Sequence, residues 1–204
     1  SNLLAPVGAI VSSIAWIRSQ TARSQQIKVP VVCVGNLVAG GAGKTPVALS
    51  LAKRLKLRGA VVHFLSRGYG GRLRGPHQVD EVSDNVNNVG DEALLLARVA
   101  PTWISVNRLV GGRLAQDNGA EVILMDDGFQ NPTIHKDFSI ITIDSKTRFG
   151  NGYTIPLGPL REMPNRALSR AQAVIIIGDQ NNELIQNIKL FIINMVDKDQ
   201  SDFD

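Results

Sequence analysis

The chain has a single cysteine among its 204 residues, Cys33, so no disulfide can form within it. This usage suits a reducing compartment, and Cys33 lies in an apolar run where we expect a small buried hydrophobe. Aromatic residues make up only 5% of the chain. That is too few for the stacking platforms used to bind single-stranded nucleic acid, and we expect no nucleic-acid partner.

Low-complexity tracts and internal repeats are also lacking, and 44% of the residues are hydrophobic and 20% charged. These values describe a globular protein with one substantial core rather than a disordered chain. The net charge of +4 is mildly basic. Such a charge favours anionic partners, namely nucleotides, phosphorylated substrates or acidic lipid surfaces, although it also serves solubility alone.

No apolar run reaches the roughly 20 residues that a membrane-spanning helix needs. The run at residues 3–17 is shorter, and basic residues follow it instead of preceding it, which argues against a signal peptide. Trp16 beside Arg18 resembles an interfacial anchor. We therefore expect an apolar and basic helix over residues 1–28 that lies on a membrane surface, or alternatively one that packs on the protein's own core.

From residue 29 onward, short β-branched runs alternate with helical segments. This alternation predicts an α/β fold of the P-loop type, with a mostly parallel sheet, helices on both faces and ligands at the carboxyl ends of the strands. We place this domain at residues 29–204. The expected strands are 29–34, 60–65, 102–106, 122–125, 138–143 and 173–177, and the expected helices are 46–57, 91–99 and 108–117.

The strongest motif is a glycine-rich loop, GNLVAGGAGKT at 35–45, between the first expected strand and the first expected helix. Glycine enters positive-φ conformations without steric cost, so backbone N–H groups can turn inward around an anion. The helix that follows adds unpaired N–H donors and a favourable dipole. We therefore expect a nucleotide phosphate to be bound by Gly40, Gly41, Ala42, Gly43, Lys44 and Thr45.

Two side chains of this loop suit ATP bound with Mg²⁺. Lys44 can reach the β and γ phosphates, and the hydroxyl of Thr45 can ligate the metal ion. The usual pattern has glycine where this chain has Val38. We expect the additional glycines at 40 and 41 to supply the missing flexibility.

Asp126 and Asp127 follow the apolar run EVILM, at the expected end of a buried strand. Two carboxylates near a phosphate loop suit Mg²⁺, which prefers oxygen ligands. The simpler alternative is that DDG only makes a turn.

Asp91 and Glu92 open an expected helix after the loop 85–88. Acidic residues are common in a first helical turn because of the dipole alone. However, phosphoryl transfer to an alcohol needs a group that orients the hydroxyl and accepts its proton. Of the two, Asp91 is the better candidate.

Arginines form a further group near expected strand ends. Their planar forks match phosphate oxygens, although solvated surface charge explains any single one equally well. They follow the expected strand 60–65 and recur in a later loop and helix, at Arg67, Arg72, Arg74, Arg161, Arg166 and Arg170.

Taken together, these segments resemble the tetraacyldisaccharide 4′-kinase family of lipid A synthesis. The resemblance covers roughly residues 3–180. It rests on VPVVCVGNLVAGGAGKTPV at 29–47, LSRGYGG at 65–71, VGDEALLLAR at 89–98, DDGFQ at 126–130 and GNGYTIPLGPLRE at 150–162.

The resemblance implies transfer of the ATP γ-phosphate to the 4′-hydroxyl of an acylated glucosamine disaccharide 1-phosphate, at the cytoplasmic face of the bacterial inner membrane. It implies that Lys44, Asp91 and Arg161 are catalytic, with Asp91 belonging to the pair that activates the hydroxyl. On the metal side it implies Thr45, Asp126, Asp127 and Glu162. For the disaccharide phosphate it implies Arg67, Tyr69 and Arg72.

The chain also departs from the family pattern. Asn131 follows DDGFQ where the family usually has histidine. Family members continue into a second, C-terminal lobe, which carries the histidine that pairs with the acid matched by Asp91, and we expect this lobe to be absent here. The three histidines of the chain, His63, His77 and His135, are expected to be structural or solvated.

Two alternatives to a lipid kinase remain. One is a membrane-associated, nucleotide-dependent switch ATPase that transfers no phosphate to a substrate. Such proteins often carry a lysine early in the loop, where this chain has Val38 and Ala39. The other is a non-catalytic nucleotide-binding fragment.

Overall fold

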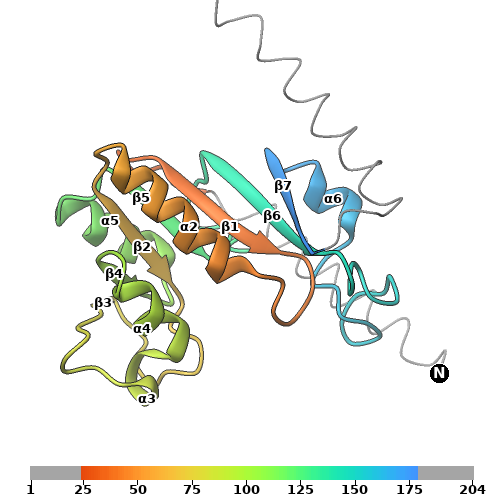
Figure 1. Cartoon of the computed structure of the whole chain (residues 1–204), viewed down its shortest axis with the longest axis horizontal. Coiled ribbons are helices and arrows are strands. Elements are labelled where there is room, and N and C mark those ends of the chain that lie inside the picture. Colours follow the sequence, from red (N-terminus) through yellow and green to blue (C-terminus); the bar gives the residue numbers. More distant parts are fainter. Residues whose placement is uncertain (1–23, 179–204) are drawn as a thin grey trace, which may run out of the picture.

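The computed structural model describes residues 24–178 of the chain (Figure 1). They form one seven-stranded sheet in the order β3-β4-β2-β5-β1-β6-β7. The strands are β1 (Val31–Asn36), β2 (Val62–Ser66), β3 (His77–Gln78), β4 (Thr102–Ile104), β5 (Val122–Asp126), β6 (Phe138–Asp144) and β7 (Ala173–Ile177). The helices are α2 (Lys44–Leu57), α3 (Val86–Val89), α4 (Asp91–Ala97), α5 (Arg108–Asp117) and α6 (Pro164–Leu168).

The sheet is parallel except at one edge, where β3 pairs antiparallel with β4. All the other strands therefore end at the same edge of the sheet. The loops that follow β1, β2 and β5 lie beside one another there, because β5 pairs with both β1 and β2. This arrangement confirms the mostly parallel α/β sheet.

The sheet is buried on both faces because neighbouring positions of each central strand point to opposite sides. Val31 and Cys33 of β1 belong to one apolar cluster, whereas Val34 belongs to another. In β5, Met125 joins the first cluster and Leu124 the second. Burial also raises the pKa of the Cys33 thiol to about 12, in agreement with its predicted role as a small buried hydrophobe.

Helices cover both faces of the sheet (Figure 1). On one face, α2 places Ala48 and Ala52 into the cluster around Phe64, and α4 adds Leu96. On the other face, α5 contributes Ala115. Alanines at a spacing of four on α2 form a narrow stripe of small side chains, which lets the helix approach the strands closely.

The long elements lie where the sequence predicts them, with ends that differ by a few residues. Helix α5 has the predicted bounds, and Asn107 caps it by accepting a hydrogen bond from the Val110 N–H. Helix α2 begins at Lys44, two residues before the predicted start. Strand β3 and the short helix α3 were not predicted, because elements of two to four residues carry no periodic signal. Helix α6 contains Arg166 and corresponds to the helix expected, without bounds, among Arg161, Arg166 and Arg170.

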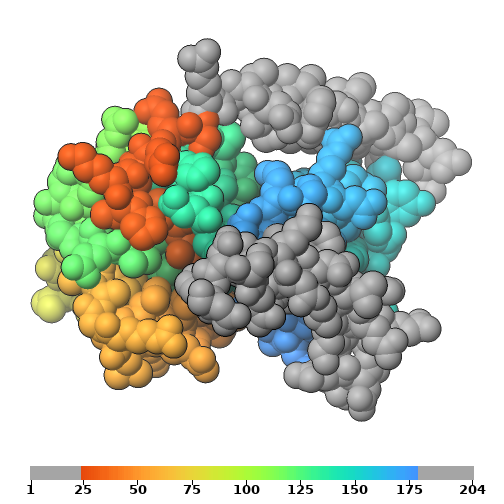
Figure 2. All heavy atoms as spheres, turned by 90° about the horizontal axis from the view of Figure 1, so that it is seen from above, coloured from red at the N-terminus to blue at the C-terminus, as the bar shows by residue number. Residues whose placement is uncertain are grey.

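The predicted N-terminal helix lies mainly outside the described residues, since the description begins at residue 24. Residues 24–30 are not helical, and Gln25 forms a parallel bridge with Ile134. In Figure 2 this segment (red) lies against α5 (green), where the Lys28 N–H donates to the Gln116 side chain. Within residues 24–178, no helix is both long and apolar enough to span a bilayer.

Candidate functional site

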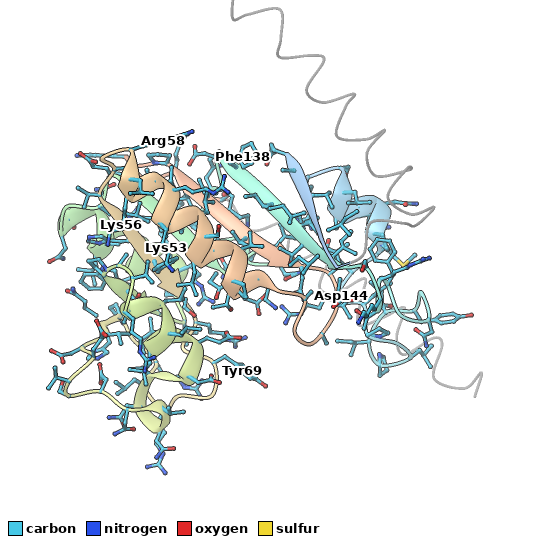
Figure 3. The ribbon with its side chains drawn as sticks, viewed as in Figure 1. Lys53, Lys56, Arg58, Tyr69, Phe138 and Asp144 are labelled. Atoms are coloured by element: carbon cyan, nitrogen blue, oxygen red, sulfur yellow. The ribbon has the colours of Figure 1, made fainter. Side chains whose placement is uncertain are left out.

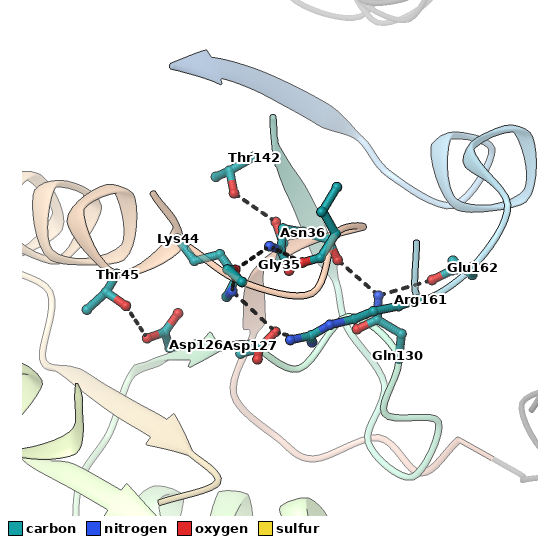
Figure 4. Close-up of polar contacts among 12 residues, drawn as sticks. Gly35, Asn36, Lys44, Thr45, Asp126, Asp127, Gln130, Thr142, Arg161 and Glu162 are labelled. Atoms are coloured by element: carbon teal, nitrogen blue, oxygen red, sulfur yellow. Dashed lines mark hydrogen bonds and ion pairs between the residues drawn. The ribbon is translucent and has the colours of Figure 1, made fainter. Parts of the chain in front are cut away.

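The loop of residues 35–45, here called the phosphate loop, starts from a buried polar residue at the end of β1. The side chain of Asn36 donates to the carbonyl oxygens of Val38 at 2.7 Å and Gly40 at 3.1 Å. Thr142 of β6 donates to the carbonyl oxygen of Gly35 at 3.2 Å (Figure 4). These bonds hold the first half of the loop to the sheet edge.

The segment 150–162 pairs with the same half of the loop, which explains why Val38 can replace the usual glycine. Val38 forms an antiparallel bridge with Leu160. The Ala39 N–H donates to the Pro159 carbonyl, and the Arg161 N–H donates to the Leu37 carbonyl. Extended backbone of this kind accepts a β-branched residue.

The second half of the loop turns into α2 through glycine. Gly43 precedes the helix with φ 69°, in the left-handed region, and Gly40 has φ 119°. Gly41 is not among the residues with positive φ. The positive φ favours glycine there, and a Cβ on Gly43 would also lie 2.2 Å from Cδ1 of Ile177, so that this methyl group would have to shift.

Lys44 lies at the start of α2 and is only 7% exposed. Its Nζ lies 3.8 Å from Oδ1 of Asp127, and the same oxygen accepts a hydrogen bond at 2.8 Å from Arg161 (Figure 4). The carboxylate thus holds two cations side by side. Asp127 has φ 53°, a left-handed conformation that aspartate tolerates better than most residues.

Asp126, the last residue of β5, faces the beginning of the same helix. Its Oδ2 accepts a hydrogen bond from the Thr45 hydroxyl at 3.1 Å, while its Oδ1 is buried without a hydrogen-bond partner in the structure. Burial, and after it the charge of Glu92, raise the pKa of Asp126 to about 6. The ammonium of Lys44 offsets this effect only in part.

These oxygens fit Mg²⁺, which in phosphate sites uses one or two carboxylates together with phosphate oxygens. The Thr45 hydroxyl and the unpartnered Oδ1 of Asp126 are the two donors that best meet this requirement. Among residues 24–178, no group of three or more His, Cys, Asp or Glu side chains could hold a metal ion by itself. The donor set thus suits a magnesium ion shared with a nucleotide rather than a metal held by protein alone.

Glu162, predicted on the metal side, joins the site indirectly. Its Oε1 accepts from Gln130 at 3.3 Å, and Gln130 also donates to the carbonyl oxygen of Asn36 at 3.0 Å (Figure 4). Its Oε2 pairs with Arg170, whose guanidinium lies 4.8 Å from the ring centroid of Phe129. Both carboxylate oxygens are therefore engaged by the protein.

A cavity of about 400 Å³ opens beside Asp127 and Arg161, and no residue of the phosphate loop is among its lining residues. The end of β2 and segments that follow several of the strands line it: Ser66, Arg67, Tyr69, Glu92, Val106, Arg108, Asp127, Gln130, Asn131, Pro132 and Arg161. It is wide enough for a polar group such as a sugar phosphate.

The two neighbouring acids at the start of α4 have different surroundings. Glu92 lines the cavity and is half-buried, and burial raises its pKa. Asp91 is exposed, and its Oδ1 accepts a hydrogen bond from the Glu92 N–H at 2.9 Å. The structure thus places Glu92 at the cavity, while Asp91, the predicted base, lies just outside it.

This pair is held in place by the close approach of two loops. Gly90 has φ 88°, and a Cβ there would lie 2.2 Å from the carbonyl oxygen of Tyr69. Glycine therefore lets the segment after β2 pack directly against the start of α4.

Of the residues predicted to bind the disaccharide phosphate, Arg67 and Tyr69 line the cavity and Arg72 does not. Tyr69 is 78% exposed and projects outward from the loop (Figure 3). Arg108 also lines the cavity, although sequence reasoning used it only as the first residue of a helix. Its position at the carboxyl end of β4 is the signal that could have identified it.

The histidines lie away from this cavity. His63 is buried, accepts a hydrogen bond from the Trp103 indole at 3.3 Å, and has its pKa lowered by burial. His77 contacts Asp84 at 2.7 Å. His135 lies 3.8 Å from Asp137. All three have partners that suit structural or solvated roles.

Comparisons with known proteins all identify the same family. A family model described as tetraacyldisaccharide-1-P 4′-kinase matches residues 1–200. A tetraacyldisaccharide 4′-kinase of Parvibaculum lavamentivorans is 54% identical over 178 residues, which cover 87% of this chain and 52% of that protein. One from Rhodospirillum rubrum is 50% identical over 188 residues, or 92% of this chain and 57% of that protein.

A solved structure is similar as well. The crystal structure of LpxK from Aquifex aeolicus in complex with ATP superimposes with a TM-score of 0.75 at 32% identity, covering 85% of this chain and 57% of that one. The chain thus spans about half the length of the curated relatives it matches.

Proposed function

Because the chain belongs to the tetraacyldisaccharide-1-P 4′-kinase family, we propose that it carries the nucleotide-binding half of a lipid kinase. The reaction is transfer of the γ-phosphate of ATP to the 4′-hydroxyl of a tetraacyldisaccharide 1-phosphate. The observation that supports this most directly is the contact of Lys44 and Arg161 with one carboxylate, at 3.8 Å and 2.8 Å, beside a glycine turn into α2.

The nucleotide phosphates are bound by the backbone N–H groups of residues 40–45 and by the ammonium of Lys44. Helix α2 contributes the positive end of its dipole. Arg161 neutralises part of the charge on the transferring phosphoryl group. Its guanidinium is already held in the site by its hydrogen bond to Asp127. Asp127 keeps both cations in position before ATP arrives.

Thr45 and Asp126 would hold Mg²⁺, with Asp127 and Glu162 on the same side. When bound, the ion neutralises charge on the β and γ phosphates. The unpartnered Oδ1 of Asp126 supports this assignment. Glu92 lines the neighbouring cavity, and its negative charge raises the pKa of Asp126.

The acceptor enters the cavity of about 400 Å³ beside Asp127. Asp91 orients its hydroxyl and accepts the proton, as a member of the catalytic pair of the family. Arg67 and Tyr69, on the loop after β2, line this cavity and contact the disaccharide, and Arg72 contacts it from the same loop outside the cavity. The protein acts at the cytoplasmic face of the inner membrane, where such an acceptor resides.

Labelled ATP tests this function when it is offered to the purified chain with Mg²⁺ and the acylated disaccharide 1-phosphate. Label on the sugar is the expected result. Label released only to water would instead indicate a nucleotide switch. ATP binding without any turnover would mean that the chain binds nucleotide but does not catalyse transfer by itself.

A further inference from the structure

Asn36, the last residue of β1, is a buried polar residue to which the proposed reaction gives no role. Its side chain is fully buried. Its Nδ2 donates to the carbonyl oxygens of Val38 and Gly40, whereas its Oδ1 has no hydrogen-bond partner within residues 24–178. The two amide atoms are not interchangeable, because both neighbours of Nδ2 are carbonyl oxygens, which only accept.

The unsatisfied Oδ1 means that folding alone does not account for this amide. A buried oxygen without a donor costs stability, whereas an apolar side chain of similar shape would complete the strand without that cost. The other residues of β1 are apolar or glycine. What the amide adds is its pair of hydrogen bonds to the phosphate loop, so its contribution lies in the conformation of that loop.

The first of these bonds fixes the peptide group between Val38 and Ala39. In a trans peptide the carbonyl and the following N–H point in opposite directions. The Val38 carbonyl faces Asn36, and the Ala39 N–H donates on the other side, to the Pro159 carbonyl. This peptide is thus held at both ends by the protein.

The second bond fixes the peptide group between Gly40 and Gly41, which the protein holds at one end only. The Gly40 carbonyl accepts from Asn36 at 3.1 Å and from the Lys44 ammonium at 3.4 Å. The Gly41 N–H therefore points away from Asn36, and no main-chain carbonyl of the described chain accepts it. Because Gly41 is exposed, this N–H is open to a ligand.

Asn36 is itself held firmly at the strand end (Figure 4). Its main-chain carbonyl accepts from Gln130 at 3.0 Å, and the carbonyl of Gly35 accepts from Thr142. A Cβ on Gly35 would lie 2.5 Å from Cβ of Phe129, so this ring residue packs directly on the backbone before Asn36. The amide thus projects from a well-supported strand, as a group that orients a loop requires.

We propose that Asn36 is a positioning residue that holds the phosphate loop in its binding conformation before a nucleotide arrives. It acts through the peptide between Gly40 and Gly41, whose N–H it directs outward as a donor to a phosphate oxygen. This inference rests on the proposed function, in which the loop binds the phosphates of ATP. Because the loop is ordered in advance, less conformational entropy is lost on binding.

The test compares Asn36→Leu and Asn36→Ser with the unmodified chain. Leucine keeps the branched shape but removes both donors, and should weaken binding of ATP with Mg²⁺ about 10-fold. Serine keeps a hydroxyl donor close to the backbone, and should weaken binding only about 3-fold. Calorimetric titration measures the affinities, and urea unfolding establishes that each variant is folded under the same conditions.

A second measurement separates positioning from a merely structural role. Nitrogen-15 relaxation of the nucleotide-free chain reports the order of the Gly41 N–H on the ps–ns timescale. This order should fall in Asn36→Leu and fall less in Asn36→Ser.

Asn118→Leu is the matched control. The side chain of Asn118 also donates from Nδ2 to a main-chain carbonyl, that of Leu114, but it lies at the end of α5 and is exposed. This variant should change neither the ATP affinity nor the order of Gly41. If Asn36→Leu does not fold, Asn36→Ser decides the test against this control.

Other outcomes overturn the inference in distinguishable ways. If ATP affinity falls while Gly41 keeps its order, Asn36 acts on the nucleotide directly and does not position the loop. If affinity is unchanged in the folded variants, the amide has no part in nucleotide binding, whether or not Gly41 loses order. If the unmodified chain binds no ATP at all, the proposed function fails, whereas failure of the inference alone leaves that binding intact.

Discussion

On the phosphate-loop side of the cavity, Lys44 and Arg161 share the carboxylate of Asp127, whereas Arg67 and Arg108 on the opposite side have no acidic partner within residues 24–178. The paired side keeps its geometry without a ligand, since protein groups balance one another. The unpaired side has positive charge that Asp127 offsets in part. Charge pairing thus distinguishes the side that we propose for the phosphates of ATP from the side that we propose for the acceptor.

The largest effect is expected from a substitution that removes the central cation of the paired side. Lys44→Ala should weaken ATP binding about 100-fold or more, because a buried ammonium contacting phosphate is lost. Calorimetric titration with Mg²⁺ and ATP measures this. Lys53→Ala, on the exposed face of the same helix (Figure 3), should bind like the unmodified chain. Equal affinities for both variants would remove the phosphate loop from the mechanism.

The next effect concerns Asp126, whose buried Oδ1 has no hydrogen-bond partner among residues 24–178. Its pKa of about 6 in the folded chain exceeds the ordinary 3.8. The folded state therefore holds a proton that the unfolded state has released, and metal-free stability should fall as pH rises from about 4 to about 6. Asp126→Asn should remove this loss and stabilise the chain at pH 7.5 by up to about 3 kcal/mol.

Urea unfolding at several pH values, without metal or nucleotide, measures this gain. Asp117→Asn, an exposed change of the same charge on α5, should produce no such gain. In the transfer assay, Asp126→Asn should lose activity because the metal-side oxygens are altered. A variant that is less stable at pH 7.5 than at pH 4 by the same amount as the unmodified chain would contradict the assignment.

An intermediate effect is expected at Gly90, where the loop after β2 packs against the start of α4. Gly90→Ala should destabilise the chain by about 2 kcal/mol, since it adds a steric conflict with the Tyr69 carbonyl to the cost of positive φ. Gly59→Ala is the matched control, because Gly59 has the same φ of 88° with nothing within 4 Å. It should cost about 1 kcal/mol. Thermal unfolding of the two variants isolates the contact between the loops, and equal losses would rule that contact out.

The smallest effect tests why the phosphate loop tolerates Val38. Val38→Gly restores the usual glycine, but it should cost about 1 kcal/mol because glycine loses more conformational freedom on folding. ATP affinity should hardly change, because the bridge to Leu160 is made by backbone atoms. Val82→Gly, at a valine that is 95% exposed, provides the reference for unfolding measurements. A large gain in ATP affinity would show that Val38 restricts the loop.

The paired side was predictable because its groups lie in short contiguous motifs. Glycines, Lys44 and Thr45 follow one another at 40–45, and the acids follow an apolar strand, so local chemistry and the strand-end rule suffice. The same reasoning predicts the central strands and α5, whose periodicity and cap agree. The edge strand β3 has only two residues and is held by β4 alone, which local sequence does not encode.

The unpaired side was less predictable because tertiary contacts create it. Apart from its position after β4, Arg108 looks like an ordinary helix residue, and its burial beside Arg67 is seen only in the structure. Asp91 and Glu92 are adjacent, so sequence alone offers no reason to choose the one that faces the cavity. Only the structure shows that Glu92 lines the cavity, next to the point where Gly90 packs against the Tyr69 carbonyl.

Ile177, the last residue of β7, fills the space beside Gly43 where any larger residue would need to fit. The last described strand and the turn into α2 are therefore in direct contact. Occupation of the loop by phosphate alters the surroundings of this side chain. The Cδ1 methyl resonance of Ile177 should consequently report nucleotide occupancy in solution, without any label on the nucleotide itself.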